Sequence, residues 1–313
     1  MPLDPQLAEL FSKFASIGYR SWSALTPDEA RAQMAALAPR RPPTPVDRVD
    51  NASVPGPGGP IAIRLYRPLG AGQGALPVLV YLHGGGHVLG NLDSHDETSR
   101  NLANTAGVLV VAVDYRLAPE HKFPAAAEDS FAVTRWAATE AGRYGGDGSR
   151  LAVAGDRAGG NHAAVVALMA RDAGGPRLAM QVLVYPVADY ACDGTPSYET
   201  FANGYGILDA ASMRWFRNHY LRGPEDVLDW RASPLRAGDL SGLPPALVLL
   251  AECDPLHDEG FAYATRLREA GNAVELVEYP GMAHGFFGWR PVVPASEAAQ
   301  KLACERLNAA WRR

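Results

Sequence analysis

Four short segments carry residues that could act together in covalent chemistry, and each begins within five residues after a run of apolar residues. The first is His83-Gly84-Gly85-Gly86 and the second is Gly155-Asp156-Arg157-Ala158-Gly159. The third begins with Asp254 and the fourth with His284. Glycines two positions before and two after a central residue predict a strand–turn–helix elbow that exposes that residue. An acidic residue and then a histidine later in the chain match the order nucleophile, acid, histidine.

The three glycines after His83 carry no side chains, so a ligand can approach the backbone closely there. A phosphate-binding loop is not indicated, because no Gly-Lys-Ser/Thr follows them. We expect an oxyanion hole, in which the N–H groups of Gly84 and Gly85 point at a developing negative charge. A tight turn without a chemical role is the alternative interpretation.

Composition narrows the classes of function. The chain has 313 residues, of which 47% are apolar and 20% charged, as in an ordinary globular protein. The net charge of -5 gives no positive surplus for a nucleic-acid partner. Cys192, Cys253 and Cys304 are widely spaced, which favours reduced thiols and a cytoplasmic location. We expect no membrane association, because neither a secretory signal nor an apolar run of about 18 residues is present.

Apolar runs alternate with helical patterns along most of the chain. We expect strands over 61–66, 76–82, 107–113, 151–154, 180–185, 246–251 and 274–279, and helices over 94–106, 125–144, 158–172, 259–270 and 295–311. Such alternation predicts a mostly parallel sheet with helices on both faces. Chemistry in such sheets takes place beyond the carboxyl ends of the strands, where the four segments lie.

Two amphipathic helices are expected before the first strand. Residues 7–14 place their apolar side chains on one face, and Thr26 to Glu29 forms a capping box with Pro27 at the first helical position. A proline-rich connector, residues 40–46, follows. This N-terminal arm either packs on the main domain or forms a lid over an active site.

Together with Asp114-Tyr115-Arg116-Leu117-Ala118-Pro119-Glu120, these segments resemble the bacterial hormone-sensitive-lipase-like (family IV) carboxylesterases over nearly the whole chain. The resemblance implies an α/β-hydrolase fold: an eight-stranded, mostly parallel sheet flanked by helices, with a helical cap. It implies cap helices and a connector over 1–45, a catalytic domain over 46–313 and a cap insertion near 190–230. A homodimer through the edge strand 274–279 is also expected.

The resemblance further implies hydrolysis of small, short-chain acyl esters without a metal or an organic cofactor. Asp254 and His284 would be the acid and the base. The N–H groups of Gly84, Gly85 and Ala158 would form the oxyanion hole. Asp156 and Tyr185 would support the site, and Trp215, in an aromatic helix of the cap insertion, either packs there or contacts the substrate.

Three residues depart from the family pattern. Arg157 stands where the family has its nucleophilic serine, and a guanidinium is a hydrogen-bond donor only, so it cannot attack a carbonyl. His87 replaces an aromatic or other apolar residue, and His162 replaces an apolar one. Three hypotheses remain: an active site redesigned around His87, Arg157 and His162, a natural relative that binds a small ligand without hydrolysis, or an inactivated variant of an ordinary esterase.

In a redesigned site, Arg157 would orient a carboxylate or stabilise an oxyanion. A nearby histidine, His284 included, would then act as general base or nucleophile. A metal site built from His87, His162 and His284 has suitable ligands, but the adjacent guanidinium would repel the cation. We therefore expect no metal.

Overall fold

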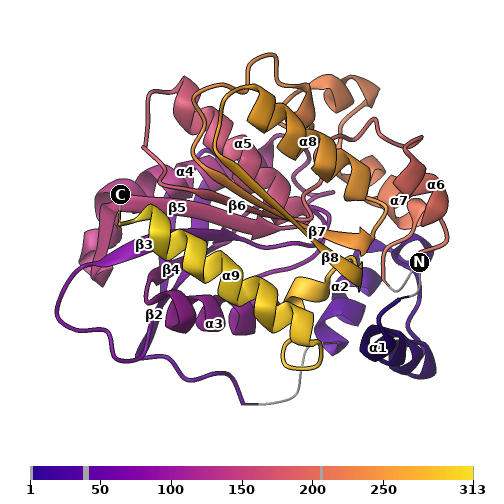
Figure 1. Cartoon of the computed structure of the whole chain (residues 1–313), viewed down its shortest axis with the longest axis horizontal. Coiled ribbons are helices and arrows are strands. Elements are labelled where there is room, and N and C mark those ends of the chain that lie inside the picture. The colour runs from indigo at the N-terminus through magenta and orange to yellow at the C-terminus, as the bar shows by residue number, and fades with distance from the viewer. Residues whose placement is uncertain (1–2, 38–41, 205–206, 313) are drawn as a thin grey trace.

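One sheet forms the centre of the molecule (Figure 1). The computed structural model describes residues 3–37, 42–204 and 207–312. The strands of these residues lie in the order β1-β2-β4-β3-β5-β6-β7-β8. Their bounds are Arg48–Gly56 (β1), Gly59–Arg67 (β2), Leu76–Leu82 (β3), Leu109–Asp114 (β4), Gly146–Asp156 (β5), Gln181–Val184 (β6), Ala246–Cys253 (β7) and Val274–Ala283 (β8). β2 pairs antiparallel with β1 and β4, and all other neighbours are parallel.

Helices cover both faces of the sheet, which is why strands such as β3 and β6 are continuous apolar runs. α4 (Ala125–Glu140), α5 (Ala158–Asp172) and α8 (His257–Glu269) contribute to the apolar core on one face. α3 (Asp96–Ala106) and α9 (Pro294–Ala310) lie side by side on the other. Burial of these apolar side chains on two faces stabilises the sheet.

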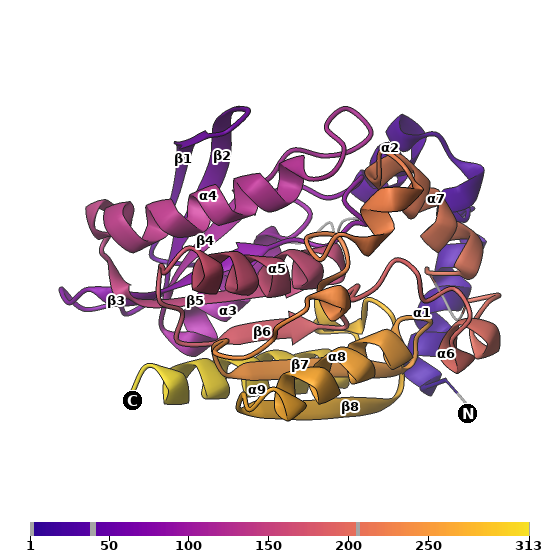
Figure 2. The ribbon, with the colours of Figure 1, turned by 90° about the horizontal axis from the view of Figure 1, so that it is seen from above.

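Four helices gather at one end of the sheet, where the central parallel strands reach their carboxyl ends (Figure 2). They are α1 (Pro5–Ser16) and α2 (Pro27–Ala36) from the N-terminal arm, and α6 (Pro196–Thr200) and α7 (Ala210–Tyr220) from the insertion. Short 3-10 helices complete the chain over Trp22–Ala24, Ala141–Tyr144, Pro224–Leu228, Pro234–Arg236 and Phe286–Gly288. This cap lies over the turns that carry the four candidate segments.

The expected fold class is confirmed: the sheet is eight-stranded, mostly parallel and flanked by helices. The strand pattern missed β1, because Arg48–Gly56 is largely exposed and pairs only with β2. The capping box is confirmed, since Thr26 Oγ1 accepts from Glu29 N and Glu29 Oε2 accepts from Thr26 N. The division of the chain at residue 45 stays a prediction, and residues 40 and 41 of the connector lie outside the described residues.

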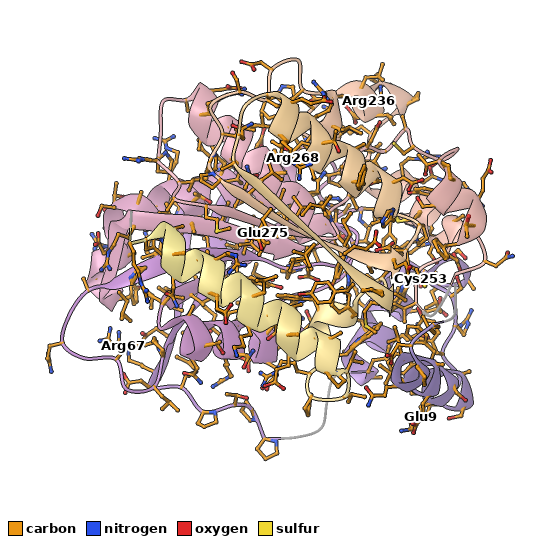
Figure 3. The ribbon with its side chains drawn as sticks, in the orientation of Figure 1. Glu9, Arg67, Arg236, Cys253, Arg268 and Glu275 are labelled. Carbon is orange, nitrogen blue, oxygen red and sulfur yellow. The ribbon has the colours of Figure 1, made fainter. Side chains whose placement is uncertain are left out.

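The cysteines and the lengths of the helices bear on two of the sequence expectations, reduced thiols and the absence of a membrane-spanning helix. Cys192, Cys253 and Cys304 are free thiols, and Cys253 closes β7 directly before Asp254 (Figure 3). In the described ranges of the chain, no helix combines the length and the apolar character needed to cross a membrane. The cytoplasmic location stays a prediction.

Candidate active site

Arg157 occupies a sharp turn between β5 and α5. Its backbone angles are φ 60° and ψ -121°, its N–H donates to the Val184 carbonyl (2.9 Å), and its carbonyl accepts from Asn161 N–H (3.0 Å). A Cβ on Gly155 would collide with the Gly159 carbonyl, and one on Gly159 with the Leu82 carbonyl. The two glycines therefore let helix and strand approach closely enough for the turn. A positive φ costs a non-glycine residue about 1–3 kcal/mol, so the surrounding structure must hold Arg157 there.

Asp254 and His284 form a buried pair at the ends of the two last strands. Asp254 follows β7, and its Oδ2 accepts a hydrogen bond from His284 Nδ1 at 2.7 Å. Its other oxygen, Oδ1, accepts from Leu256 N–H at 2.9 Å. The carboxylate thereby fixes the imidazole so that Nε2 carries the unshared electron pair. His284 lines the same cavity as Arg157, and a histidine oriented in this way is suited to general base catalysis.

The glycine turn after β3 faces this cavity, but with a different pair of glycines from the expected one. Gly84 N–H donates to His95 Nε2 at 3.3 Å, so it is not directed at a ligand. Gly85, Gly86 and Ala158 line the cavity. Within the described residues, the N–H groups of Gly85 and Gly86 donate no hydrogen bond. Gly86 therefore replaces Gly84 as a candidate oxyanion donor, while Gly85 and Ala158 keep positions that fit the expected role.

The guanidinium of Arg157 extends along the glycine turn. Its Cδ lies close to Gly84, and Nη2 would be 2.7 Å from a Cβ on Gly285, so both glycines make room for it. Nε is 3.6 Å from Asp156 Oδ2 and is buried without a hydrogen-bond partner among the described residues. Burial is the largest single effect and opposes the charge, but Asp156, Tyr185, Tyr81 and Asp254 together outweigh it and raise the pKa of Arg157. Arg157 is therefore a permanent cation beside His284.

Asp156 supports the site from below the turn. It accepts a hydrogen bond from the Tyr81 hydroxyl at 2.7 Å and lies 3.4 Å from His95 Nε2. Burial alone would raise the pKa of Asp156, but His95, Arg157 and the Tyr81 hydroxyl outweigh that effect and hold the pKa well below its usual range. Asp156 is thus a carboxylate at every pH at which the protein would be assayed.

The cavity that joins these groups encloses about 50 Å³ and is otherwise apolar. Side chains of the arm (Trp22, Met34), the insertion (Ile207, Leu208, Met213, Phe216) and the turns (Leu89, Val187, Tyr190, Leu256) form its walls. Arg157 also lines a second, more polar cavity of about 730 Å³ under the arm. The arm therefore helps enclose the site as well as packing on the main domain.

His87 and His162 are not brought to Arg157. Their rings hydrogen-bond to each other (His87 Nδ1 to His162 Nε2, 2.9 Å), both are fully buried, and neither lines the cavity. The ring of His87 stacks on Tyr220 of α7, with centroids 3.7 Å apart. The reason is geometric: the backbone of His87 has a φ of 63°, and its side chain turns behind the glycines toward the first turn of α5. The expected constellation of three new groups around one pocket is therefore not the observed one.

Burial dominates the ionisation of this pair. It lowers the pKa of His162 to about 3 and, together with the neighbouring His162, lowers the pKa of His87 well below its ordinary value. Both imidazoles are neutral at neutral pH. In the described part of the chain, no group of three His, Cys, Asp or Glu side chains could hold a metal ion. The three-histidine metal site is therefore not formed.

Tyr185 and Trp215 do not line the cavity. Tyr185 is fully buried, and its ring centroid is 4.9 Å from that of His284, so it supports the histidine instead of contacting a ligand. Trp215 packs on Phe216 (5.0 Å) and His219 (4.4 Å). Phe216 is the residue of α7 that reaches the cavity, because it lies on the buried face of the helix.

Sequence reasoning also missed Asn161, which ties the elbow to the insertion. Its Nδ2 donates to the carbonyls of Val187 and Ala232, each at 2.8 Å. Its place four residues after Arg157, among small residues of a buried helix, is the signal that could have found it. A buried amide there must have partners.

Comparison with known proteins agrees with this geometry. A family described by the alpha/beta hydrolase fold matches residues 79–288. The chain is 41% identical to an ethyl acetate hydrolase of Pseudomonas putida, over 98% of this chain and 99% of the relative. It is 48% identical to the carboxylesterase NlhH of Mycobacterium tuberculosis, over 76% of this chain and 75% of the relative.

Solved structures give the same result. A hyperthermophilic esterase from Pyrobaculum calidifontis superposes with a TM-score of 0.89 at 41% identity, over 99% of each chain. A thermostable esterase from Pseudomonas putida superposes with a TM-score of 0.92 at 38% identity, over 99% of this chain and 98% of the other. The chain therefore belongs to the alpha/beta hydrolase family and has the scaffold of a carboxylic ester hydrolase.

Proposed function

We propose that this chain binds small, short-chain acyl esters between Arg157 and His284 but hydrolyses them far more slowly than a serine esterase does. The observation that carries the proposal is the place of Arg157 in the turn between β5 and α5. In the carboxylesterases that the sequence resembles, the nucleophilic serine stands there. A guanidinium offers no electron pair to an ester carbonyl, so no acyl-enzyme forms at this position.

The rest of the machinery supports a slow reaction. A substrate carbonyl lying against Gly85, Gly86 and Ala158 would be polarised by their N–H groups. His284, held by Asp254, would then take a proton from water at Nε2. Water replaces the serine as nucleophile in this route: its oxygen adds to the ester carbonyl, the acyl C–O bond breaks, and the leaving alkoxide takes the proton back from His284. The acid and the alcohol form without an acyl-enzyme.

His87 and His162 would act on this reaction only through the position of the glycine turn. Their hydrogen bond joins the turn to the first turn of α5, so it links two sets of candidate oxyanion donors. A site redesigned to use these histidines directly is the alternative, and a binding protein without turnover is another. Neither histidine lines the cavity, so neither is placed to contact a ligand there.

The test compares turnover of p-nitrophenyl butyrate by the chain and by its Arg157→Ser variant. Loss of the nucleophile in a Ser-His-Asp hydrolase costs about 10⁶ in kcat, so we expect the serine variant to be faster by several orders of magnitude. Arg157→Ser combined with His284→Ala is the control and should lose the gain. Fast turnover by the parent chain that a serine-directed phosphonate abolishes would contradict the proposal.

A further inference from the structure

The cation at the edge of the apolar cavity has spare hydrogen-bond donors. Arg157 Nε is buried without a partner among the described residues, and Asp156 lies 3.6 Å away, beyond hydrogen-bond distance. Tyr81 donates to Oδ1 of Asp156, so Oδ2 is the oxygen that faces Arg157 Nε. Asp254 is occupied by His284 and by Leu256 N–H. Asp156 thus forms an ion pair with the guanidinium, but among the described residues no carboxylate accepts a hydrogen bond from it.

Backbone donors line the same cavity. Gly85, Gly86 and Ala158 contribute to its wall, and Ala158 opens α5, a helix of 15 residues. The first N–H groups of a helix lack intrahelical partners and favour a negative charge. A guanidinium and several N–H groups around one cavity suit a small anion.

The remaining walls of the cavity determine which kind of group can accompany the anion. Leu89, Leu208, Met213, Phe216 and Leu256 present apolar surface, and the enclosed volume of about 50 Å³ suits a few carbon atoms. A strongly hydrated inorganic anion would lose its water against these walls without compensation. A planar carboxylate matches the fork of a guanidinium and can accept two parallel hydrogen bonds.

From these observations we propose that the cavity beside Arg157 binds a small aliphatic monocarboxylate. The carboxylate contacts the guanidinium and the backbone N–H groups, and the tail fills the apolar cavity. The proposal rests on the same site as the proposed function, and its ligand is the acid that hydrolysis of a short-chain ester would release. It goes beyond that function in the ligand, which is an anion and not a neutral ester.

The test is isothermal titration calorimetry of the whole chain with butyrate, with butyramide as the neutral ligand of matched shape. We expect one butyrate per chain, butyramide at least about tenfold weaker, and butyrate affinity at least about tenfold weaker in Arg157→Met. Arg143→Met removes the same charge from an exposed site just after α4, away from the cavity lining, and should leave the affinity unchanged. Thermal unfolding of each variant checks that it is folded.

Three results with butyrate would overturn the inference. They are no detectable butyrate binding, equal affinities for butyrate and butyramide, and butyrate affinity that Arg157→Met leaves unchanged. Inorganic phosphate binding as tightly as butyrate would also overturn it, since the apolar walls would then play no part. Turnover of p-nitrophenyl butyrate is measured on the same samples: fast turnover contradicts the proposed function alone, and absent butyrate binding contradicts this inference alone.

Discussion

At the scale of single residues, the three unusual side chains differ in what surrounds them. Arg157 has a carboxylate nearby and stays charged, while His87 and His162 contact each other and aromatic rings and form no ion pair with a described residue. A buried imidazole without a counter-charge is neutral, because the charged form loses its hydration. The same cavity edge therefore combines a permanent cation with two neutral histidines behind it.

The neutral pair predicts an acid-sensitive fold. The folded-state pKa values of His87 and His162 are depressed, so the unfolded chain takes up protons first as the pH falls. The contribution of the two neutral imidazoles to the free energy of unfolding is complete above about pH 6.5 and is lost as the pH falls toward about 3. When the pH is lowered from 7.5 to 5, the free energy of unfolding should decrease by about 2 kcal/mol for each of the two histidines.

Urea unfolding at the two pH values measures this loss. The matched control replaces both histidines with apolar residues, His87→Phe with His162→Leu, which keeps the packing and removes both protonation sites. We expect the double variant to lose much less stability between pH 7.5 and 5 than the parent. Equal losses in the two proteins would show that other groups cause the acid sensitivity.

At the scale of elements, the site depends on helix α2 of the arm. Met34 of α2 lines the cavity, and Arg31 of the same helix donates to the carbonyls of Val88 (3.0 Å) and Ala118 (3.0 Å) beside the glycine turn. The helix begins with the Thr26 capping box. The capping box therefore stabilises a helix that helps to enclose the site.

Thr26→Ala should loosen α2 locally. Loss of an N-cap side chain costs about 1 kcal/mol, and a helix of an arm opens without global unfolding. We expect amide hydrogen exchange in α2 to speed up about fivefold at neutral pH, with little change in the central strands. Ser16→Ala, which removes an exposed hydroxyl from the end of α1, is the control. Unchanged exchange in α2 would contradict the role of the capping box.

At the scale of the whole molecule, β8 forms one edge of the sheet. Its polar side chains are already paired within the chain, Glu275 with Arg306 and Glu278 with His257. The outer backbone groups are open for pairing with another strand, as is typical of an edge. We keep the prediction that two copies pair along residues 274–279.

Hydrogen exchange as a function of protein concentration checks this pairing. Amides of residues 274–279 should exchange more slowly at concentrations where sedimentation velocity shows a dimer than at concentrations where it shows a monomer. The β1 edge, Arg48–Gly56, is the internal control and should not change. A dimer whose β8 amides remain unprotected would place the interface elsewhere.

The sequence by itself determined the frame of the site. The glycines around Arg157, the acidic residue after β7 and the histidine after β8 could be located because each follows an apolar run. Turn and strand patterns depend on residues that are close together in the sequence, so they can be recognised without knowledge of distant contacts. β1 was missed for the same reason, since its polar, exposed pattern carries no local strand signal.

Tertiary structure decided the direction of each side chain and N–H group. Gly84 donates to His95, eleven residues away, and Gly86 faces the cavity in its place. His87 turns toward His162 and Tyr220, and Phe216 instead of Trp215 reaches the ligand space. These outcomes depend on contacts between segments far apart in the sequence. Residue type and spacing place a residue at the site, but only packing against its neighbours fixes which way it faces.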